Sequence, residues 1–203
     1  MSQRDASQTR LKRQAGYRDF MSSFPSGVAV VTSMDGRGQP FGCTCSSLCS
    51  VTLEPPTLLI CVRNDSGTLA ALRSKGAFAV NLLHDRGRRA ASVLASGLAD
   101  RFDHVRWEPG GALQLPYLVQ DAHSVAECRI TSSKTVGDHT VVFGEVSNVT
   151  CRQDVPLLYG FRRFETWNVA ESDLGAAEKV TQPDGAANQL TGRAQAAVVP
   201  EMS

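Results

Sequence analysis

Short runs of apolar and β-branched residues, bounded by turn residues, constrain the fold of this chain more than any other feature. Residues 27–48 are typical of a hairpin, with β-branched residues on both sides of a turn at Asp35-Gly36. Residues 124–152 have the pattern of a longer antiparallel hairpin that turns near 136–138. Much of the chain is therefore predicted to pair with its own neighbour in the sequence.

The remaining periodic segments complete this prediction. Residues 57–62 and 77–83 are short, predominantly apolar runs, as in buried strands. Helical patterns are confined to 68–74 and 85–95, and there is no βαβ repeat. The sequence therefore predicts a mainly β fold, a closed antiparallel barrel with short helical insertions.

Charge and hydropathy exclude several classes of protein. The net charge is +1 and 20% of the 203 residues are charged, without the basic excess of a nucleic-acid binder. No apolar run approaches the roughly 18 residues that span a bilayer. The first residues are polar and lack the apolar core of a signal peptide. We expect a cytoplasmic protein that binds neither nucleic acid nor membrane.

The length suits one domain with a tail at each end. Residues 1–15 show no apolar periodicity and are predicted to be a disordered arm. Residues 168–203 are rich in Ala, Gly, Gln and Pro without a large apolar face, which predicts a flexible C-terminal tail. The folded domain is expected over 16–167.

The segment from Gly42 to Pro56 is the first candidate for a binding surface. It places small hydroxyl and thiol residues in a β-rich run, where a strand that only fills a core would carry Val, Ile or Phe. Small donors and acceptors allow a flat, polar-edged ligand to lie close to the backbone. The alternative is an edge strand whose Ser and Thr side chains face water, and this segment alone fits both.

Two further segments are candidates for an anion site. The turn at 64–68 runs into a helix start, with Ser66 or Asp65 as its N-cap. Free backbone N–H groups and hydroxyls at a helix start can bind an anion, although an ordinary cap with nothing bound is commoner. Arg101 follows another turn, where it is either a surface arginine or a partner for a phosphate.

His139 lies at the turn of the longer predicted hairpin, where functional groups concentrate more than on a core face. A lone histidine is more often structural, but Asp138 beside it can orient the ring or tune its charge. Residues 156–164 combine aromatic and arginine side chains. Such a run either stacks on planar rings or closes a barrel.

The six cysteines match neither a disulfide framework nor a metal site. Cys43, Cys45 and Cys49 crowd one strand, and the other three stand alone in apolar β-like runs. The first three lack the C-x2-C spacing of zinc sites, and no histidine follows at finger spacing. We expect no bound metal, and thiols that behave as small hydrophobic side chains.

Five segments occur in a recognisable order: FPSGVAVVTSMDGRGQPFGCTCSSLCSVTLEPPTLLICV, NDSGTLAALRSKGAFAVNLL, LASGLADRF, GDHTVVFGEV and PLLYGFRRF. From about Tyr17 to Phe164 the chain thereby resembles the short-chain flavin reductases, the small components of two-component flavin-dependent monooxygenases. The resemblance implies the FMN-binding split barrel, an antiparallel β-barrel that pairs as a homodimer. This agrees with the barrel predicted from the strand pattern.

The resemblance also implies a set of site residues. Those expected along the flavin are Thr44, Cys45, Ser46, Ser47 and Leu48, with Ser50 and Val51 nearby. Those expected at the phosphate are Ser66, Gly67, Thr68, Arg101 and Phe102, and those facing the nicotinamide and its diphosphate are His139, Tyr159 and Arg162. His139 is the expected catalytic residue, the one whose loss most affects nicotinamide use. The strand thiols depart from the larger aliphatic, Phe or Thr residues common in relatives. They either influence the flavin or are simple small-residue exchanges.

The implied activity is that of an NAD(P)H:flavin oxidoreductase. Such an enzyme passes a hydride from NADH or NADPH to FMN or FAD and supplies reduced flavin to a separate monooxygenase component. The alternatives on this fold are a flavoprotein with tightly bound flavin that acts on another substrate, and a non-enzymatic flavin- or haem-binding protein. The residues do not choose between FMN and FAD. Arg162 or Arg163 can meet the 2′-phosphate of NADPH, or either can be solvated.

Overall fold

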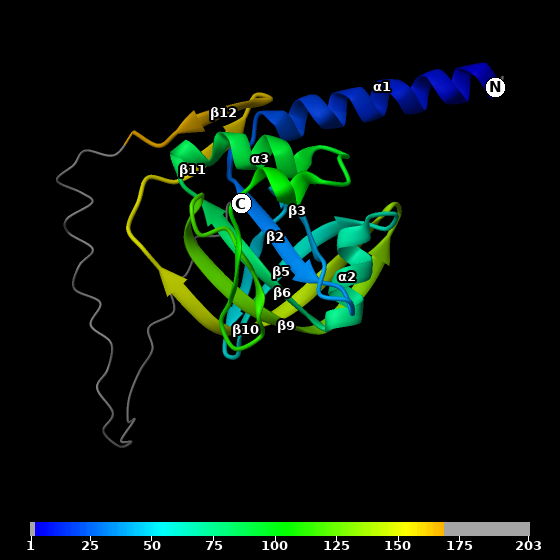
Figure 1. Ribbon diagram of the computed structural model, residues 1–203. Coiled ribbons are helices and arrows are strands. Elements are labelled where there is room, and N and C mark those ends of the chain that lie inside the picture. Colours follow the sequence, from blue (N-terminus) through cyan, green and yellow to red (C-terminus); the bar gives the residue numbers. More distant parts are fainter. Residues whose placement is uncertain (1–2, 169–203) are drawn as a thin grey trace, which may run out of the picture. The chain divides into compact units, whose positions relative to one another are not determined.

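The computed structural model describes residues 3–168, and β-strand is the predominant secondary structure of this part of the chain, as predicted (Figure 1). The strands of the principal sheet are β2 (Ala29–Met34), β3 (Pro40–Cys45), β4 (Cys49–Leu53), β5 (Pro56–Arg63), β6 (Ala77–Leu83), β9 (Ala122–Val136) and β10 (His139–Cys151). The expected tail over 168–203 lies outside the described residues, apart from Asn168.

These seven strands form one antiparallel sheet in the order β3-β2-β6-β9-β10-β5-β4. The two edge strands, β3 and β4, are consecutive in the chain and are joined only by residues 46–48. The sheet must therefore curl until its edges meet, which gives the predicted antiparallel split barrel. We call this meeting point, residues 46–48 with Cys61 of β5, the seam.

Both predicted hairpins are confirmed. In the turn between β2 and β3, the Asp35 carboxylate accepts hydrogen bonds from the backbone amides of Arg37 and Gln39, both at 2.8 Å. The turn between β9 and β10 has Gly137 at a φ of 58°. Glycine adopts this left-handed region without a Cβ penalty, so the turn can be tight.

The two predicted helices are also confirmed, as α2 (Gly67–Lys75) and α3 (Arg88–Ala95), the latter preceded by the 3-10 turn η1 (Asp85–Gly87). Ser66, rather than Asp65, is the N-cap of α2, because its hydroxyl accepts a hydrogen bond from the Leu69 amide at 3.1 Å. Gly76 ends this helix at a φ of 69°. The local start and stop signals in the sequence were sufficient to place α2.

The barrel interior is aliphatic around one fully buried ring, that of Phe78. A Cβ placed on Gly144 would lie 2.5 Å from this ring, so the strand opposite requires a glycine. Val31, Ile60 and Val80 fill the same cluster. This packing holds the strands that carry the site at fixed positions.

Several short elements were not predicted: β1 (Ser26–Gly27), η2 (Arg101–His104), β7 (Glu108–Gly110), β8 (Leu115–Tyr117), β11 (Leu157–Gly160) and β12 (Arg163–Thr166). Strands β1, β11 and β12 form a separate three-stranded sheet. The aromatic and arginine run at 156–164 therefore folds as a hairpin beside the barrel. Strands of two to four residues give too little periodicity to be read from sequence.

The expectation of a disordered arm over residues 1–15 is wrong for the described residues, which form α1 (Gln3–Ser22). This helix extends from the domain, with its C-terminal end beside β11 and β12 (Figure 1). Its described side chains are exposed up to Met21, so no apolar stripe marks it, and its Gln, Arg, Ala, Leu and Lys residues favour helix by propensity alone. Neither this helix nor any other among residues 3–168 is both long and apolar enough to cross a membrane.

Candidate functional site

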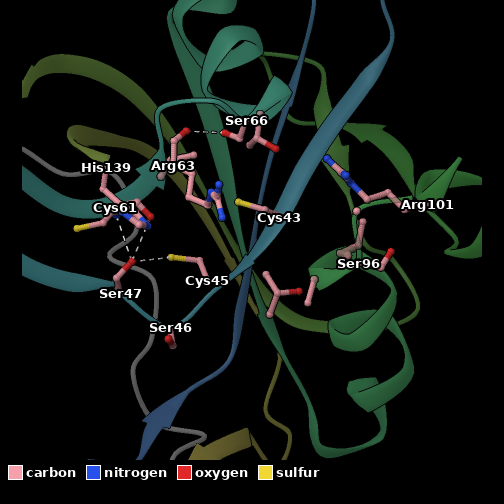
Figure 2. A pocket seen from close by; sticks show the side chains of 16 residues that line it. Cys43, Cys45, Ser46, Ser47, Cys61, Arg63, Ser66, Ser96, Arg101 and His139 are labelled. Carbon is pink, nitrogen blue, oxygen red and sulfur yellow. Dashed lines mark hydrogen bonds between the residues drawn. The ribbon is translucent and has the colours of Figure 1, made fainter. Parts of the chain in front are cut away.

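A cavity of about 740 Å³ opens beside the seam (Figure 2). We call it the first cavity. Its walls come from β3 and the seam, from β5 and the start of α2, from the end of α3 and from η2. The lining residues are Cys43, Thr44, Cys45, Ser46, Ser47, Cys61, Val62, Arg63, Ser66, Thr68, Leu94, Ala95, Ser96, Gly97, Arg101 and His139. Its volume is in the range that encloses a cofactor.

The seam wall is fixed by hydrogen bonds between residues distant in sequence. The Ser47 hydroxyl accepts a hydrogen bond from the Cys61 amide at 3.2 Å and lies 3.3 Å from the Cys61 carbonyl, to which it can donate. The same hydroxyl lies 3.2 Å from the Cys45 sulfur. On the other side, the Thr44 hydroxyl donates to the Ala91 carbonyl of α3 at 2.6 Å. The segment from Thr44 to Ser47, predicted to lie along a ligand, is therefore anchored at both ends.

Asn64 joins the two turns that the sequence singled out separately. Its side-chain amide donates to the Gly137 carbonyl at 3.1 Å, and its backbone amide donates to the Asp138 carbonyl at 2.9 Å. Its side-chain carbonyl accepts from the Thr140 hydroxyl at 2.7 Å. The turn before α2 and the turn that carries His139 therefore meet at one end of the first cavity.

His139 is oriented by its neighbour in the sequence. Its Nδ1 lies 2.8 Å from a carboxylate oxygen of Asp138, and this hydrogen bond lowers the pKa of the Asp138 carboxyl. In the pairing of β10 with β5, His139 lies directly opposite Arg63. Arg63 in turn makes a two-pronged contact with the exposed Asp65 carboxylate, at 3.0 and 2.7 Å. The ring and the guanidinium lie at the same end of the cavity (Figure 2).

The first cavity is suited to an anion. No carboxylate lines it, and of its basic residues Arg63 and His139 already contact Asp65 and Asp138, whereas Arg101 forms no ion pair among residues 3–168. Thr68 is fully buried, yet its hydroxyl has no hydrogen-bond partner among residues 3–168, and the same holds for the buried Nε of Arg101. Buried polar atoms are rarely left unpaired, so these two groups mark where a ligand with acceptor oxygens fits. The residues present therefore fit the phosphate of a flavin nucleotide.

The thiols of β3 are neutral groups at ordinary pH. Burial raises the pKa of Cys43 to about 11. Burial likewise raises the pKa of Cys45. A protonated thiol is a poor nucleophile and oxidises slowly. For Cys43 and Cys45, the raised pKa values are those of unreactive thiols.

The predicted site residues separate into three groups. Those that line the first cavity are Thr44, Cys45, Ser46, Ser47, Ser66, Thr68, Arg101 and His139. Those that line a second cavity, on the other side of the seam, are Leu48, Tyr159 and Arg162, together with Ser46 and Ser47. Those that line neither are Ser50, Val51, Gly67 and Phe102.

Packing explains the position of the last group. Ser50 and Val51 belong to β4, whose residues are all exposed. Phe102 is buried, packed edge-on against Trp107 with ring centroids 6.2 Å apart. A Cβ on Gly67 would lie 2.9 Å from the ring of Phe41, so this position is limited by packing.

The sequence did not single out several lining residues, chiefly Cys61, Arg63 and residues 94–97. Cys61 resembles any small residue in an apolar strand, and only closure of the barrel brings it to the seam. Arg63 ends the same strand, and a cation that ends a strand beside a turn is a signal that could have identified it. Residues 94–97 lie in the segment LASGLADRF, whose one basic residue, Arg101, was the clearest sign of a site.

Comparison with known proteins places this geometry in a family. A model of the flavin reductase like domain matches residues 21–168. A protein of Lentzea aerocolonigenes named flavin reductase (NADPH) is 54% identical over 153 residues, 75% of this chain and 89% of the relative. The solved structure of an NADH:FAD oxidoreductase from Streptomyces globisporus C-1027, in complex with NAD and FAD fragments, superposes with a TM-score of 0.72 at 34% identity. That superposition covers 77% of this chain and 94% of the other.

A further solved structure, nitrilotriacetate monooxygenase component B from Mycobacterium thermoresistibile, has a TM-score of 0.73 at 26% identity. The superposition covers 85% of this chain and 93% of the Mycobacterium chain. The match to the family model, over residues 21–168, includes all the residues that line the first cavity. The chain therefore belongs to the flavin reductase like domain family.

Proposed function

We propose that this protein is an NAD(P)H:flavin oxidoreductase that reduces FMN or FAD. The observation that carries the proposal is the first cavity, which has two unpaired buried polar groups and no carboxylate in its lining. Family membership supports a redox use of this cavity, because the Lentzea and Streptomyces relatives are both named as nicotinamide-dependent flavin reductases.

Different residues of the first cavity would contact different parts of the flavin. Backbone and small side chains of β3 and the seam, from Thr44 to Ser47, would lie along the ring system and the ribityl chain. Thr68 and Arg101 would bind the phosphate, which satisfies the Thr68 hydroxyl and the Arg101 Nε. Ser66 already uses its hydroxyl to cap α2, so it contributes shape more than a free donor.

Bound flavin supplies the redox chemistry: the C4–H bond of the reduced nicotinamide breaks and its hydride forms the N5–H bond of the flavin. The protein contributes alignment of the two rings. His139 lies beside the seam residue Cys61, across the cavity from Arg101 (Figure 2), and its ring is oriented by Asp138 at 2.8 Å. We propose that His139 positions the nicotinamide and that its loss affects coenzyme use more than flavin binding.

We further propose that the reduced flavin leaves for a separate monooxygenase. The Mycobacterium neighbour is described as component B of a monooxygenase, which supports this arrangement. We also propose that the protein works in the cytoplasm, whose reducing conditions suit its six cysteines as free thiols.

A homodimer is the proposed assembly. Helix α1 carries large apolar side chains that the rest of the described chain does not cover, among them Leu11, 60% exposed, and Phe20, 70% exposed. An extended helix with such residues gains stability by packing against a partner, and a second copy is the partner implied by the family resemblance. Light scattering of the full chain is expected to give twice the chain mass, and Phe20→Asp is expected to shift it toward one chain. A monomeric wild-type protein would contradict the dimer.

The test of the function is oxidation of NADH or NADPH, followed by loss of nicotinamide absorbance, with and without added FMN or FAD. We expect turnover that requires added flavin and saturates with it. The matched pair of variants is Arg101→Ala, in the first cavity, and Arg106→Ala, an exposed arginine that pairs with Glu108 away from it. Folded protein that oxidises neither coenzyme with either flavin would overturn the proposal.

A further inference from the structure

The second cavity, of about 640 Å³, adjoins the first across the seam. The two cavities share Ser46, Ser47 and Cys61, so a long ligand can extend from one into the other. Its remaining walls are the C-terminal half of α1, the segment before β1, and strands β4, β5 and β11. The lining residues are Tyr17, Arg18, Met21, Ser22, Phe24, Ser26, Ser46, Ser47, Leu48, Cys49, Leu59, Cys61, Tyr159, Gly160 and Arg162.

The composition of this lining is that of a nucleotide site. It contains two arginines and no carboxylate. It also presents the aromatic side chains of Tyr17, Phe24 and Tyr159, which supply flat surfaces for a base. Arginine with aromatic rings suits a ligand that joins a planar base to a phosphate.

The arginines of this region differ in what already neutralises them. Arg162 forms an ion pair with Asp19 of α1 at 2.5 Å. Arg163 pairs with Glu165 at 2.9 Å and does not line the cavity. Arg18, by contrast, has no carboxylate within salt-bridge distance among residues 3–168. Of these three cations, Arg18 is the one whose charge is not already balanced by a protein carboxylate.

The sequence suggested Arg162 or Arg163 for the 2′-phosphate of NADPH, and the ion pairs argue against both. We propose instead that the second cavity binds the adenosine end of NADPH and that Arg18 contacts its 2′-phosphate. This inference rests on the proposed function, because it assumes that the nicotinamide end lies beside His139 in the first cavity. NADPH differs from NADH only by this phosphate, so a single unbalanced arginine is sufficient to select between them.

The selection would come from helix α1, at the N-terminal boundary of the family match. The family match begins at residue 21, whereas Arg18 belongs to the helix before it. Two contacts hold that helix against the hairpin of β11 and β12: the Phe161 amide donates to the Ser22 carbonyl, and Arg162 pairs with Asp19. Phe161 and Arg162 have φ values of 48° and 60°, a conformation that costs free energy in residues other than glycine. The contacts with α1 offset part of that cost and keep both walls of the second cavity in place.

The first experiment measures binding without catalysis. Full-length protein saturated with FMN is titrated by calorimetry with adenosine 2′,5′-bisphosphate and, separately, with ADP, which lacks the 2′-phosphate. Arg18→Ala is expected to weaken binding of the bisphosphate about tenfold and that of ADP less than twofold. Arg13→Ala is the matched control, since Arg13 is exposed on the same helix and lines neither cavity. Wild-type protein that does not bind the bisphosphate, or equal losses for both ligands, would overturn the proposal.

The second experiment measures selectivity in turnover. The ratio of kcat/KM for NADPH to that for NADH is expected to fall about tenfold in Arg18→Ala and to keep its wild-type value in Arg13→Ala. A ratio that changes less than twofold in Arg18→Ala would overturn the assignment. If the wild-type protein oxidises neither coenzyme, the proposed function fails, while the calorimetry still decides whether Arg18 recognises the phosphate.

Discussion

The two cavities that meet at the seam are built in different ways. Contacts between residues distant in sequence fix the first, such as Thr44 with Ala91 and Asn64 with Gly137, and Thr68 in its wall is fully buried. The second has one wall on an exposed helix, held partly by the pair of Asp19 and Arg162, whose side chains are 69% and 63% exposed. The first cavity is therefore part of the barrel, whereas the second cavity depends on surface contacts. Residues that choose the coenzyme can change there without disturbing the core.

The largest expected effect is on the first cavity. Arg101→Ala removes the cation whose Nε is buried without a partner, and the KM for FMN is expected to rise roughly 30-fold, as for loss of a charged hydrogen bond of about 2 kcal/mol. Steady-state kinetics over a range of FMN concentrations measure this. Arg106→Ala should stay close to wild type, and an equal rise in both variants would mean that general surface charge, not this contact, attracts the flavin.

Thiol chemistry gives a second contrast between the cavities. The pKa of Cys43, raised by burial to about 11, leaves its thiol protonated at pH 8, whereas Cys49 is exposed and lines the second cavity. Iodoacetamide at pH 8 is expected to label Cys49 at least about twentyfold faster than Cys43, since the thiolate is the reacting form. Peptide mass spectrometry over time gives both rates. Comparable rates would show that the first cavity is far more open than its geometry indicates.

A third variant separates coenzyme use from flavin binding. His139→Ala is expected to lower kcat/KM for NADH and for NADPH by about tenfold each, because the ring contributes to alignment. The Kd for FMN, measured by fluorescence quenching, should change little. His104→Ala is the control, an exposed histidine that pairs with Asp100 and lines neither cavity. Loss of FMN binding in His139→Ala alone would assign His139 to the flavin instead.

The smallest effect is expected at the rim of the second cavity. Asp19→Asn frees Arg162 from its carboxylate and should raise the ratio of kcat/KM for NADPH to that for NADH about threefold, a modest change because both side chains are exposed. The effect should diminish as salt is added. Asp5→Asn, at the far end of the same helix, is the control. A ratio that falls in Asp19→Asn would mean that the ion pair with α1 matters more for the shape of the cavity than for its charge.

Much of the barrel could be predicted because its signals are local. The hairpin turns at Asp35 and Gly137 and the helix ends at Ser66 and Gly76 each depend on the conformation of a few consecutive residues. The helix α1 could not be predicted in the same way. Its side chains face solvent, so no apolar repeat records it, and propensity alone does not indicate that a helix packs against β11 and β12.

Local signals in the sequence predict most strands of the principal sheet, both hairpins and helices α2 and α3, because alternation, turns and caps act over a few residues. Which of the predicted site residues share a cavity depends on the tertiary structure. Closure of the barrel at residues 46–48 brings Cys61 to the seam, and Asn64 joins the turn before α2 to the turn of His139. The distinction between Arg18 and Arg162 also belongs to tertiary structure, since a carboxylate neutralises a cation only where the fold places it within a few ångströms.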